Sequence, residues 1–321
     1  MRTDPEKQGA KRRLIVIAGP TAVGKTALSL SLAQRLGGEI VGADSMQVYR
    51  RMDIGTAKAS KEERALVPHH LIDVAEPDEP FDVTRYQELA RAALEEIYAR
   101  GRMPILAGGT GFYIQAVTRD IDFNSDASDP VFREEMEAYA REHGQAALHA
   151  MLRERDPDAA DAIPPGNVRR VVRALEFLKT TGRRISEHNV AERARETPYD
   201  LTYLVLTRER SALYARIEER VDEMMEEGFL EETRALLESG IPGTAPSMQG
   251  LGYGDLQKYL RGECTLEHAV AEIKKNTRRY AKRQLSWFKR EPDAVWLDVG
   301  TMTPEEVFAR AYALCARPQM S

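Results

Sequence analysis

A stretch near the N-terminus, LIVIAGPTAVGKTALSLSLA from Leu14 to Ala33, restricts the fold more than any other part of the chain. Apolar residues run into Gly19, four residues follow, and Gly24-Lys25-Thr26 opens an apolar helical pattern. A strand, a glycine-rich turn and a helix in this order are typical of a phosphate-binding loop, or P-loop. Its backbone N–H groups, helix N-terminus and lysine surround an anion. The pattern predicts a bound phosphate but does not say whether that phosphate belongs to a nucleotide.

Further apolar segments indicate what surrounds this loop. Residues 40–43, 103–107, 201–206 and 295–299 have the pattern of buried strands, and 83–100 has the spacing of an amphipathic helix. Strands that alternate with helices predict an α/β fold, here a P-loop NTPase-like, mostly parallel sheet flanked by helices. Gly19, Asp44 and Gly108 each follow a predicted strand. We therefore expect them to meet in one crevice at the carboxyl edge of the sheet.

The region 122–198 has a different sequence pattern. Strand patterns are absent from it, and its stretches DPVFREEMEAYAREHG and NVRRVVRALEFLKTTGRR are helical and rich in charge. We expect an all-helical insertion domain at 122–198 within a P-loop α/β core formed by 1–121 and 199–321. The alternative is that these helices pack on the sheet as extra layers.

Bulk composition narrows the class of protein. The 321-residue chain has a net charge of −5 and two cysteines, and no CxxC motif occurs. These features favour a cytoplasmic protein and give no support to a zinc finger or a disulfide framework. No apolar run is long enough for a signal peptide or a membrane span, and no protein partner is indicated.

Asp44 follows the second strand in GADSMQVYRRMDIGTAK and has three chemical uses. It could ligate Mg²⁺, cap the next helix or accept a proton. Ser45 and Gln47 offer hydroxyl and amide groups that suit the edge of a nucleobase. Thr56 and Lys58 lie in a polar loop, where they either reach a phosphate or are solvated.

The sharpest charge feature is KKNTRRYAKRQLSWFKR, residues 274–290, with eight basic residues and no acidic one. On a helix of about 100° per residue, one arc of roughly 120° holds most of the cations, while Ile273, Tyr280 and Trp287 lie opposite. This basic face favours a polyanion over a merely solvated surface, because solvated faces usually interleave acids. The predicted nucleic-acid contacts on it are Arg278, Arg279, Lys282 and Arg283. Arg169, Arg170 and Arg173 form a second basic group in the insertion.

Several long motifs resemble one family. GPTAVGKT, DSMQVYRRMDIGTAK, PHHLID, GGTGFY, RALE, YARIEERVDEMMEEG and TRRYAKRQLSWF follow one another as in the bacterial tRNA dimethylallyltransferases, also called tRNA isopentenyltransferases. The resemblance spans nearly the whole chain. It implies transfer of a dimethylallyl group from dimethylallyl diphosphate to the exocyclic amine of the adenosine 3′-adjacent to the anticodon in tRNA, with release of pyrophosphate. It also implies Mg²⁺ as cofactor and a monomeric state.

The resemblance also assigns roles to residues. Asp44 would be the general base, Thr26 and Arg216 would stabilise the leaving pyrophosphate, and Thr26 would hold Mg²⁺. The residues implied to bind the diphosphate are Gly19, Pro20, Thr21, Ala22, Val23, Gly24, Lys25 and Thr26. Those implied to contact tRNA are Asp44, Ser45, Met46, Gln47, Thr110, Arg133, Asn167, Val168, Arg169, Arg170 and Val171, with the insertion gripping the anticodon stem-loop.

Three other functions are alternatives to this one. A P-loop kinase of a small metabolite explains the phosphate loop but leaves the basic face without a role. A prenyltransferase acting on free AMP or ADP would not need the segments implied to contact tRNA. A non-catalytic RNA-binding protein would not need Asp44, Lys25 and Thr26 together.

Overall fold

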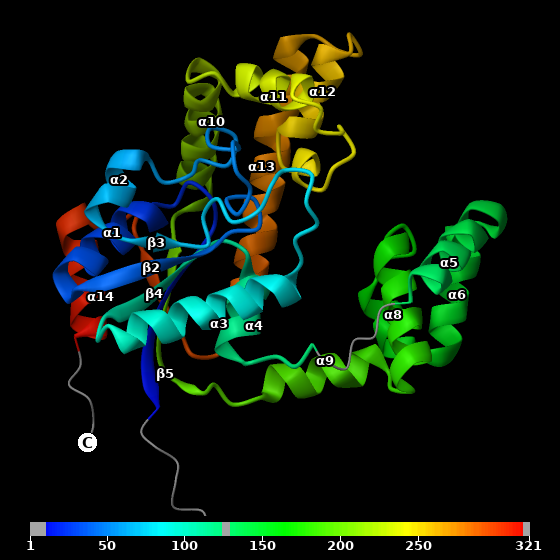
Figure 1. Ribbon diagram of the computed structural model, residues 1–321, viewed down its shortest axis with the longest axis horizontal. Coiled ribbons are helices and arrows are strands. Elements are labelled where there is room, and N and C mark those ends of the chain that lie inside the picture. The colour runs from blue at the N-terminus through cyan, green and yellow to red at the C-terminus, as the bar shows by residue number, and fades with distance from the viewer. Residues whose placement is uncertain (1–10, 124–128, 317–321) are drawn as a thin grey trace, which may run out of the picture. The chain divides into compact units, whose positions relative to one another are not determined.

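The structure, a computed structural model, describes residues 11–123 and 129–316. The chain divides into two compact units. The first, called the core unit here, comprises Met1–Thr118 with Pro198–Ser321, and the second, the helical unit, comprises Arg119–Thr197 (Figure 1). Each unit is described by itself below.

The core unit is built on a six-stranded sheet in the order β3-β2-β4-β1-β5-β6, and every pair of neighbours is parallel. This confirms the predicted α/β fold. The strands are β1 Arg12–Ala18, β2 Gly38–Ala43, β3 His69–His70, β4 Met103–Gly108, β5 Tyr199–Thr207 and β6 Ala294–Asp298. The sequence patterns missed β3, because two residues are too few for a period-2 signal.

Helices cover both faces of this sheet, so the strands are apolar on both sides. Leu14 and Val16 of β1 face one core, packed by α3 and α4, whereas Ile15 and Ile17 face the other, packed by α1, α10 and α14 (Figure 1). The helices of the core unit are α1 Lys25–Leu36, α2 Lys61–Leu66, α3 Val83–Ala99, α4 Gly111–Thr118, α10 Arg210–Glu226, α11 Phe229–Glu238, α12 Tyr253–Leu260, α13 Leu266–Phe288 and α14 Pro304–Cys315, with a 3₁₀ turn at Ser247–Gln249.

A third apolar cluster lies among α10, α11, α12 and α13. Phe229, Tyr253 and Ile273 belong to it, and they pack with Val48 and Met52 from the segment that follows β2. Part of the segment 44–58 therefore packs on this apolar cluster.

The helical unit holds α5 Pro130–His143, α6 Gln145–Arg155, α7 Pro157–Ala162, α8 Val168–Thr181 and α9 Ile185–Ala194. Its described residues contain no strand. Leu148, Leu152, Val172 and Leu175 form its core. Asp129, Asp156 and Asn167 cap α5, α7 and α8 through their side chains, which explains the helix starts in this region.

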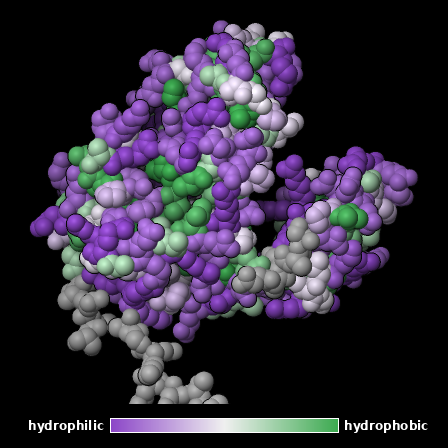
Figure 2. Space-filling model, viewed as in Figure 1, coloured by the Kyte–Doolittle hydropathy of each residue, from purple (hydrophilic) through white to green (hydrophobic). Residues whose placement is uncertain are grey.

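The surface agrees with a charge-rich composition. On the face shown in Figure 2, hydrophilic residues cover most of each unit, with smaller hydrophobic areas among them. Within residues 11–123 and 129–316, no helix has both the length and the apolar character needed to cross a membrane.

Candidate active site

The P-loop joins β1 to α1, and two of its glycines are required by geometry. A Cβ atom on Gly19 would lie 2.6 Å from the carbonyl oxygen of Leu206, so the loop packs directly on β5. Gly24 has a φ of 104° and is the N-cap of α1. Lys25 donates from Nζ to the carbonyl oxygen of Pro20 at 2.7 Å. The lysine therefore folds back over the loop at the positive end of α1.

A buried glutamine that the sequence analysis did not single out fixes this loop. Gln284 of α13, 5% exposed, accepts a hydrogen bond from Thr21 N at 2.9 Å and donates from Nε2 to Gly109 O at 2.9 Å. The P-loop and the glycine turn after β4 are thus joined through α13. The available signal was a polar residue on the apolar side of that helix.

Asp44 follows β2, and one of its two carboxylate oxygens accepts hydrogen bonds from the backbone. Its Oδ1 accepts from Met46 N at 2.9 Å and from Gln47 N at 3.4 Å. In the described part of the chain, no hydrogen-bond donor contacts its Oδ2. The capping role and the role of a base are therefore compatible, because each needs a different oxygen.

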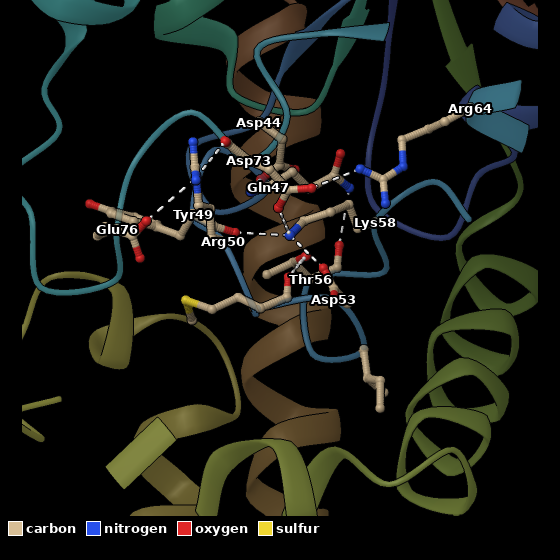
Figure 3. A network of polar contacts seen from close by, with 12 residues as sticks. Asp44, Gln47, Tyr49, Arg50, Asp53, Thr56, Lys58, Arg64, Asp73 and Glu76 are labelled. Carbon is tan, nitrogen blue, oxygen red and sulfur yellow. Dashed lines mark hydrogen bonds and ion pairs between the residues drawn. The ribbon is translucent and has the colours of Figure 1, made fainter. Parts of the chain in front are cut away.

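The segment after Asp44 folds around a buried lysine (Figure 3). The Lys58 side chain is 1% exposed and donates to Asp53 at 2.6 Å, Asp73 at 2.7 Å and the carbonyl oxygen of Tyr49 at 2.8 Å. Thr56 donates to the carbonyl oxygen of Met52. Both alternatives considered for Lys58 are wrong: the side chain is neither solvated nor free to reach a phosphate, since two carboxylates neutralise it.

Gln47 is also partly committed to this segment. Its Nε2 donates to the carbonyl oxygens of Thr56 and Ala57, at 3.1 and 3.2 Å. Only its Oε1 is left for a ligand. Ser45 and Thr110 lie together, because Thr110 Oγ1 accepts from Ser45 N at 3.0 Å.

Two neighbouring cavities open at the carboxyl edge of the sheet. The first, of about 400 Å³, is lined by the P-loop, Gln47, Arg216 and Glu223. The second, of about 320 Å³, has an apolar side formed by Val221, Met224, Phe229 and Ile273. The residues that line both are Thr21, Ala22, Asp44, Thr56, Ala57, Arg220 and Tyr280. Asp44 therefore lies where a polar cavity meets a partly apolar one.

Arg220 is the functional candidate that the sequence analysis missed. It lies one turn after Arg216 on α10 and lines both cavities, whereas Arg216 lines the first. Arg216 is ion-paired with Glu219 at 3.0 Å and its side chain is 57% exposed. Among the described residues, no carboxylate lies within ion-pair distance of Arg220. Spacing on α10 was the available signal, since positions four apart share a helix face.

Two cations that line the first cavity have lowered pKa values. The pKa of Lys25 is lowered from 10.5 to about 8, mainly by burial; Asp44 opposes the shift and Arg220 adds to it. Burial likewise lowers the pKa of Arg220, whose charge is favoured by Asp44. Asp44, Glu63 and Glu223 also line this cavity, but among the described residues none of them forms an ion pair with Lys25 or Arg220. An anionic ligand beside the two cations would therefore raise both pKa values again.

The side chains at the site can be compared with those that bind a divalent metal ion. Within the described residues, no group of three or more histidine, cysteine, aspartate or glutamate side chains is placed to hold a metal ion. Thr26 is exposed at the start of α1 and lines the first cavity with Asp44. Such a sparse set fits Mg²⁺, which usually keeps several waters and is completed by substrate phosphates.

The basic face of α13 is less basic than its sequence indicates. Arg278 pairs with Glu218 and Lys274 with Asp222, both from α10, and Lys275 pairs with Glu272 at 2.7 Å. The helix ends at Phe288, so Lys289 and Arg290 do not extend the face. Arg279, Lys282 and Arg283 remain exposed, and Arg283 lies over the ring of Tyr280.

The predicted tRNA contacts of the insertion lie in the helical unit. Arg169 and Arg170 are exposed on the first turn of α8, behind the Asn167 cap. Arg133 pairs with the fully buried Glu176 at 2.8 Å. The side chain of Val171 is 0% exposed in the core of the unit, and a tRNA contact of this residue stays a prediction. Val168 also packs against that core.

The fold and the cavities define a P-loop protein whose loop lines a cavity next to a partly apolar pocket. A family model described as IPP transferase matches residues 47–291. The chain belongs to the IPP transferase family.

Relatives in sequence and structure agree with this assignment. The tRNA dimethylallyltransferase of Lachnoclostridium phytofermentans is 51% identical over 284 residues, which cover 88% of this chain and 91% of that protein. The crystal structure of a tRNA isopentenylpyrophosphate transferase from Bacillus halodurans is 45% identical, with a TM-score of 0.73 and coverage of 95% and 96%. A eukaryotic dimethylallyltransferase acting on tRNA has a TM-score of 0.81 at 30% identity, with coverage of 97% and 81%.

Proposed function

We propose that this chain is a tRNA dimethylallyltransferase. It transfers a dimethylallyl group from dimethylallyl diphosphate to the exocyclic amine of the adenosine 3′-adjacent to the anticodon. The observation that carries the proposal is the position of Asp44 between the cavity that the P-loop lines with Lys25 and Arg220 and a partly apolar cavity. Membership of the family, with relatives named for this activity, supports it.

The donor's diphosphate would lie in the first cavity. Breaking the allylic C–O bond leaves a delocalised cation and a pyrophosphate, so the protein must mainly stabilise the departing negative charge. P-loop N–H groups, Lys25 and Arg220 face that position, and Arg216 adds a more exposed charge. Thr26 would hold Mg²⁺, which supplies further positive charge to the phosphate oxygens.

The acceptor adenine would enter the second cavity. An exocyclic adenine amine is a weak nucleophile, and a carboxylate that takes its proton as the C–N bond forms lowers the barrier. Asp44 Oδ2 is available for that proton, because Oδ1 is occupied by Met46 N and Gln47 N. The base must leave the stack of the anticodon loop to reach this position.

Contacts to the rest of the tRNA are proposed on charge and exposure. Arg279, Lys282 and Arg283 on α13 and Arg169 and Arg170 on α8 are exposed cations suited to phosphates. Ser45, Met46 and Thr110 lie near Asp44, beside the proposed position of the target base. We propose a monomer, as the resemblance to the family implies.

A direct assay tests the proposal. The purified chain is incubated with dimethylallyl diphosphate, Mg²⁺ and unmodified tRNA with adenosine next to the anticodon. The tRNA is then digested to nucleosides for mass spectrometry. We expect prenylated adenosine at that position, little product with free AMP, and little with Asp44→Asn. ATP-dependent phosphorylation of a small molecule without prenylated adenosine would favour the kinase instead.

A further inference from the structure

One carboxylate outside both cavities makes an unusual set of contacts. Glu232 of α11 accepts hydrogen bonds from three consecutive backbone N–H groups: Asp53 N at 2.7 Å, Ile54 N at 2.8 Å and Gly55 N at 3.0 Å. The hydroxyl of Tyr253 donates to the same carboxylate at 2.7 Å. Glu232 lines neither cavity. Its contacts therefore act on the segment that follows β2.

Three successive N–H groups that point to one place form an anion-binding concavity. In most such concavities the anion is a ligand, but here it is a side chain of the protein itself. Hydrogen bonds to an ionised carboxylate are about twice as strong as neutral ones. Residues 53–55 are thus held by α11 although they belong to no helix or strand.

Packing holds the same segment just as closely. A Cβ atom on Gly55 would lie 2.1 Å from the Phe229 ring and 2.7 Å from the Tyr253 ring. These two rings meet edge to face, with centroids 4.9 Å apart. Residue 55 must therefore be glycine for the Glu232 contacts to form.

The chain and a set of hydrogen bonds connect this clamp with the proposed base. Residues 56 and 57 follow the clamped segment directly, and their carbonyl oxygens accept from Gln47 Nε2. The backbone N–H of Gln47 donates to Asp44 Oδ1 (Figure 3). Thr56 and Ala57 also line both cavities. A shift of the clamped segment would move these walls and loosen the turn that orients Asp44.

We propose that Glu232 is a positioning residue for the transfer reaction: its carboxylate holds residues 53–57 and thereby fixes Asp44 at the junction of the two cavities. The inference rests on the proposed function, because it assigns Asp44 the role of base. Glu232 itself touches neither substrate.

Glu232→Gln tests this directly. An amide of the same shape replaces one accepting oxygen by an N–H₂ group, which faces N–H or O–H donors whichever way it turns. We expect kcat to fall about 10- to 100-fold, since small misplacements of reacting groups have effects of this size. The KM for dimethylallyl diphosphate and the Kd for tRNA should stay within about twofold, because the P-loop and the exposed cations are unchanged. Amide hydrogen exchange of residues 53–55 should become faster.

The neighbouring residue supplies a matched control. Glu231 lies on the same helix, its side chain is 65% exposed, and its ion pair with Arg234 is long at 3.9 Å. Glu231→Gln makes the same change of charge and should behave as wild type in kcat and in exchange. Tyr253→Phe removes one of the four donors and should lower kcat only a few-fold. Tyr253→Phe can be assayed in place of Glu232→Gln if the latter folds poorly.

Equal kcat in Glu232→Gln and Glu231→Gln would overturn the inference, as would wild-type kcat with faster exchange at 53–55. A parallel rise in the donor's KM would also overturn it, because the effect would then lie in binding. If the wild-type chain transferred no prenyl group, the proposed function would fail, while the exchange rates would still test the clamp.

Discussion

Two lysines at the same edge of the sheet have opposite electrostatic surroundings. Lys58 contacts Asp53, Asp73 and a carbonyl oxygen, whereas the ammonium of Lys25, among the described residues, donates only to the carbonyl oxygen of Pro20. An enclosed cation without a carboxylate partner is costly, and the pKa of Lys25 falls to about 8 as a result. The difference separates a lysine that stabilises the fold from one kept for an anionic ligand.

Removing Lys25 should have the largest effect on turnover. In Lys25→Met the leaving pyrophosphate loses a point charge within the P-loop, and we expect kcat to fall about 100- to 1000-fold. The native fold should remain, since no carboxylate loses a partner. Steady-state kinetics with dimethylallyl diphosphate and thermal unfolding measure the two effects.

Lys58→Met is the contrasting variant. It leaves Asp53 and Asp73 without their shared cation, so the free energy of unfolding should fall by about 3 kcal/mol. Pyrophosphate affinity, measured by calorimetry below the unfolding temperature, should be retained. If the two variants lost pyrophosphate affinity equally, the distinction between the lysines would be wrong.

The second largest effect concerns the two arginines of α10. Arg220 lines both cavities and pairs with no carboxylate in the described parts of the chain, whereas Arg216 is more than half exposed and paired with Glu219. We expect Arg220→Gln to lower kcat about 100-fold and Arg216→Gln only several-fold, because exposed charges are screened. The reverse order in single-turnover rates would restore the assignment of Arg216 that the sequence resemblance implied.

These comparisons show which features could be predicted from sequence. The P-loop was predicted because its glycines, lysine and helix start are adjacent in the chain, and the strands because their apolar runs are local. The role of Lys58 could not be predicted, since one of the two carboxylates that it contacts, Asp73, is 15 residues away in the sequence. The basic face was overestimated for the same reason: Glu218 and Asp222 approach it from α10, and a charge pattern along α13 alone does not contain them.

Lys25 also predicts a pH dependence. In the free protein, Lys25 is mostly charged below pH 8 and mostly neutral above it. Because an anion binds the charged form, binding above pH 8 requires Lys25 to take up a proton. Pyrophosphate affinity should therefore fall about tenfold between pH 7 and pH 9. Lys25→Arg stays charged throughout and corrects for the ionisation of pyrophosphate itself. Parallel profiles for the two proteins would show that Lys25 does not titrate in this range.

The smallest effect is expected on α13, where the sequence showed the strongest charge. Arg279 and Lys282 are exposed cations on this face, and together they offer about two phosphate contacts. Reversing both to glutamate should weaken tRNA binding roughly fivefold and flatten its salt dependence, while kcat at saturating tRNA stays unchanged. Arg310→Glu, an exposed site on α14, is the control for net charge. An equal loss of affinity in the control would mean that α13 attracts tRNA through overall charge and not through contact. A loss of kcat without a loss of affinity would instead show that these cations act on the transfer reaction itself, as we expect for Lys25 in the first cavity.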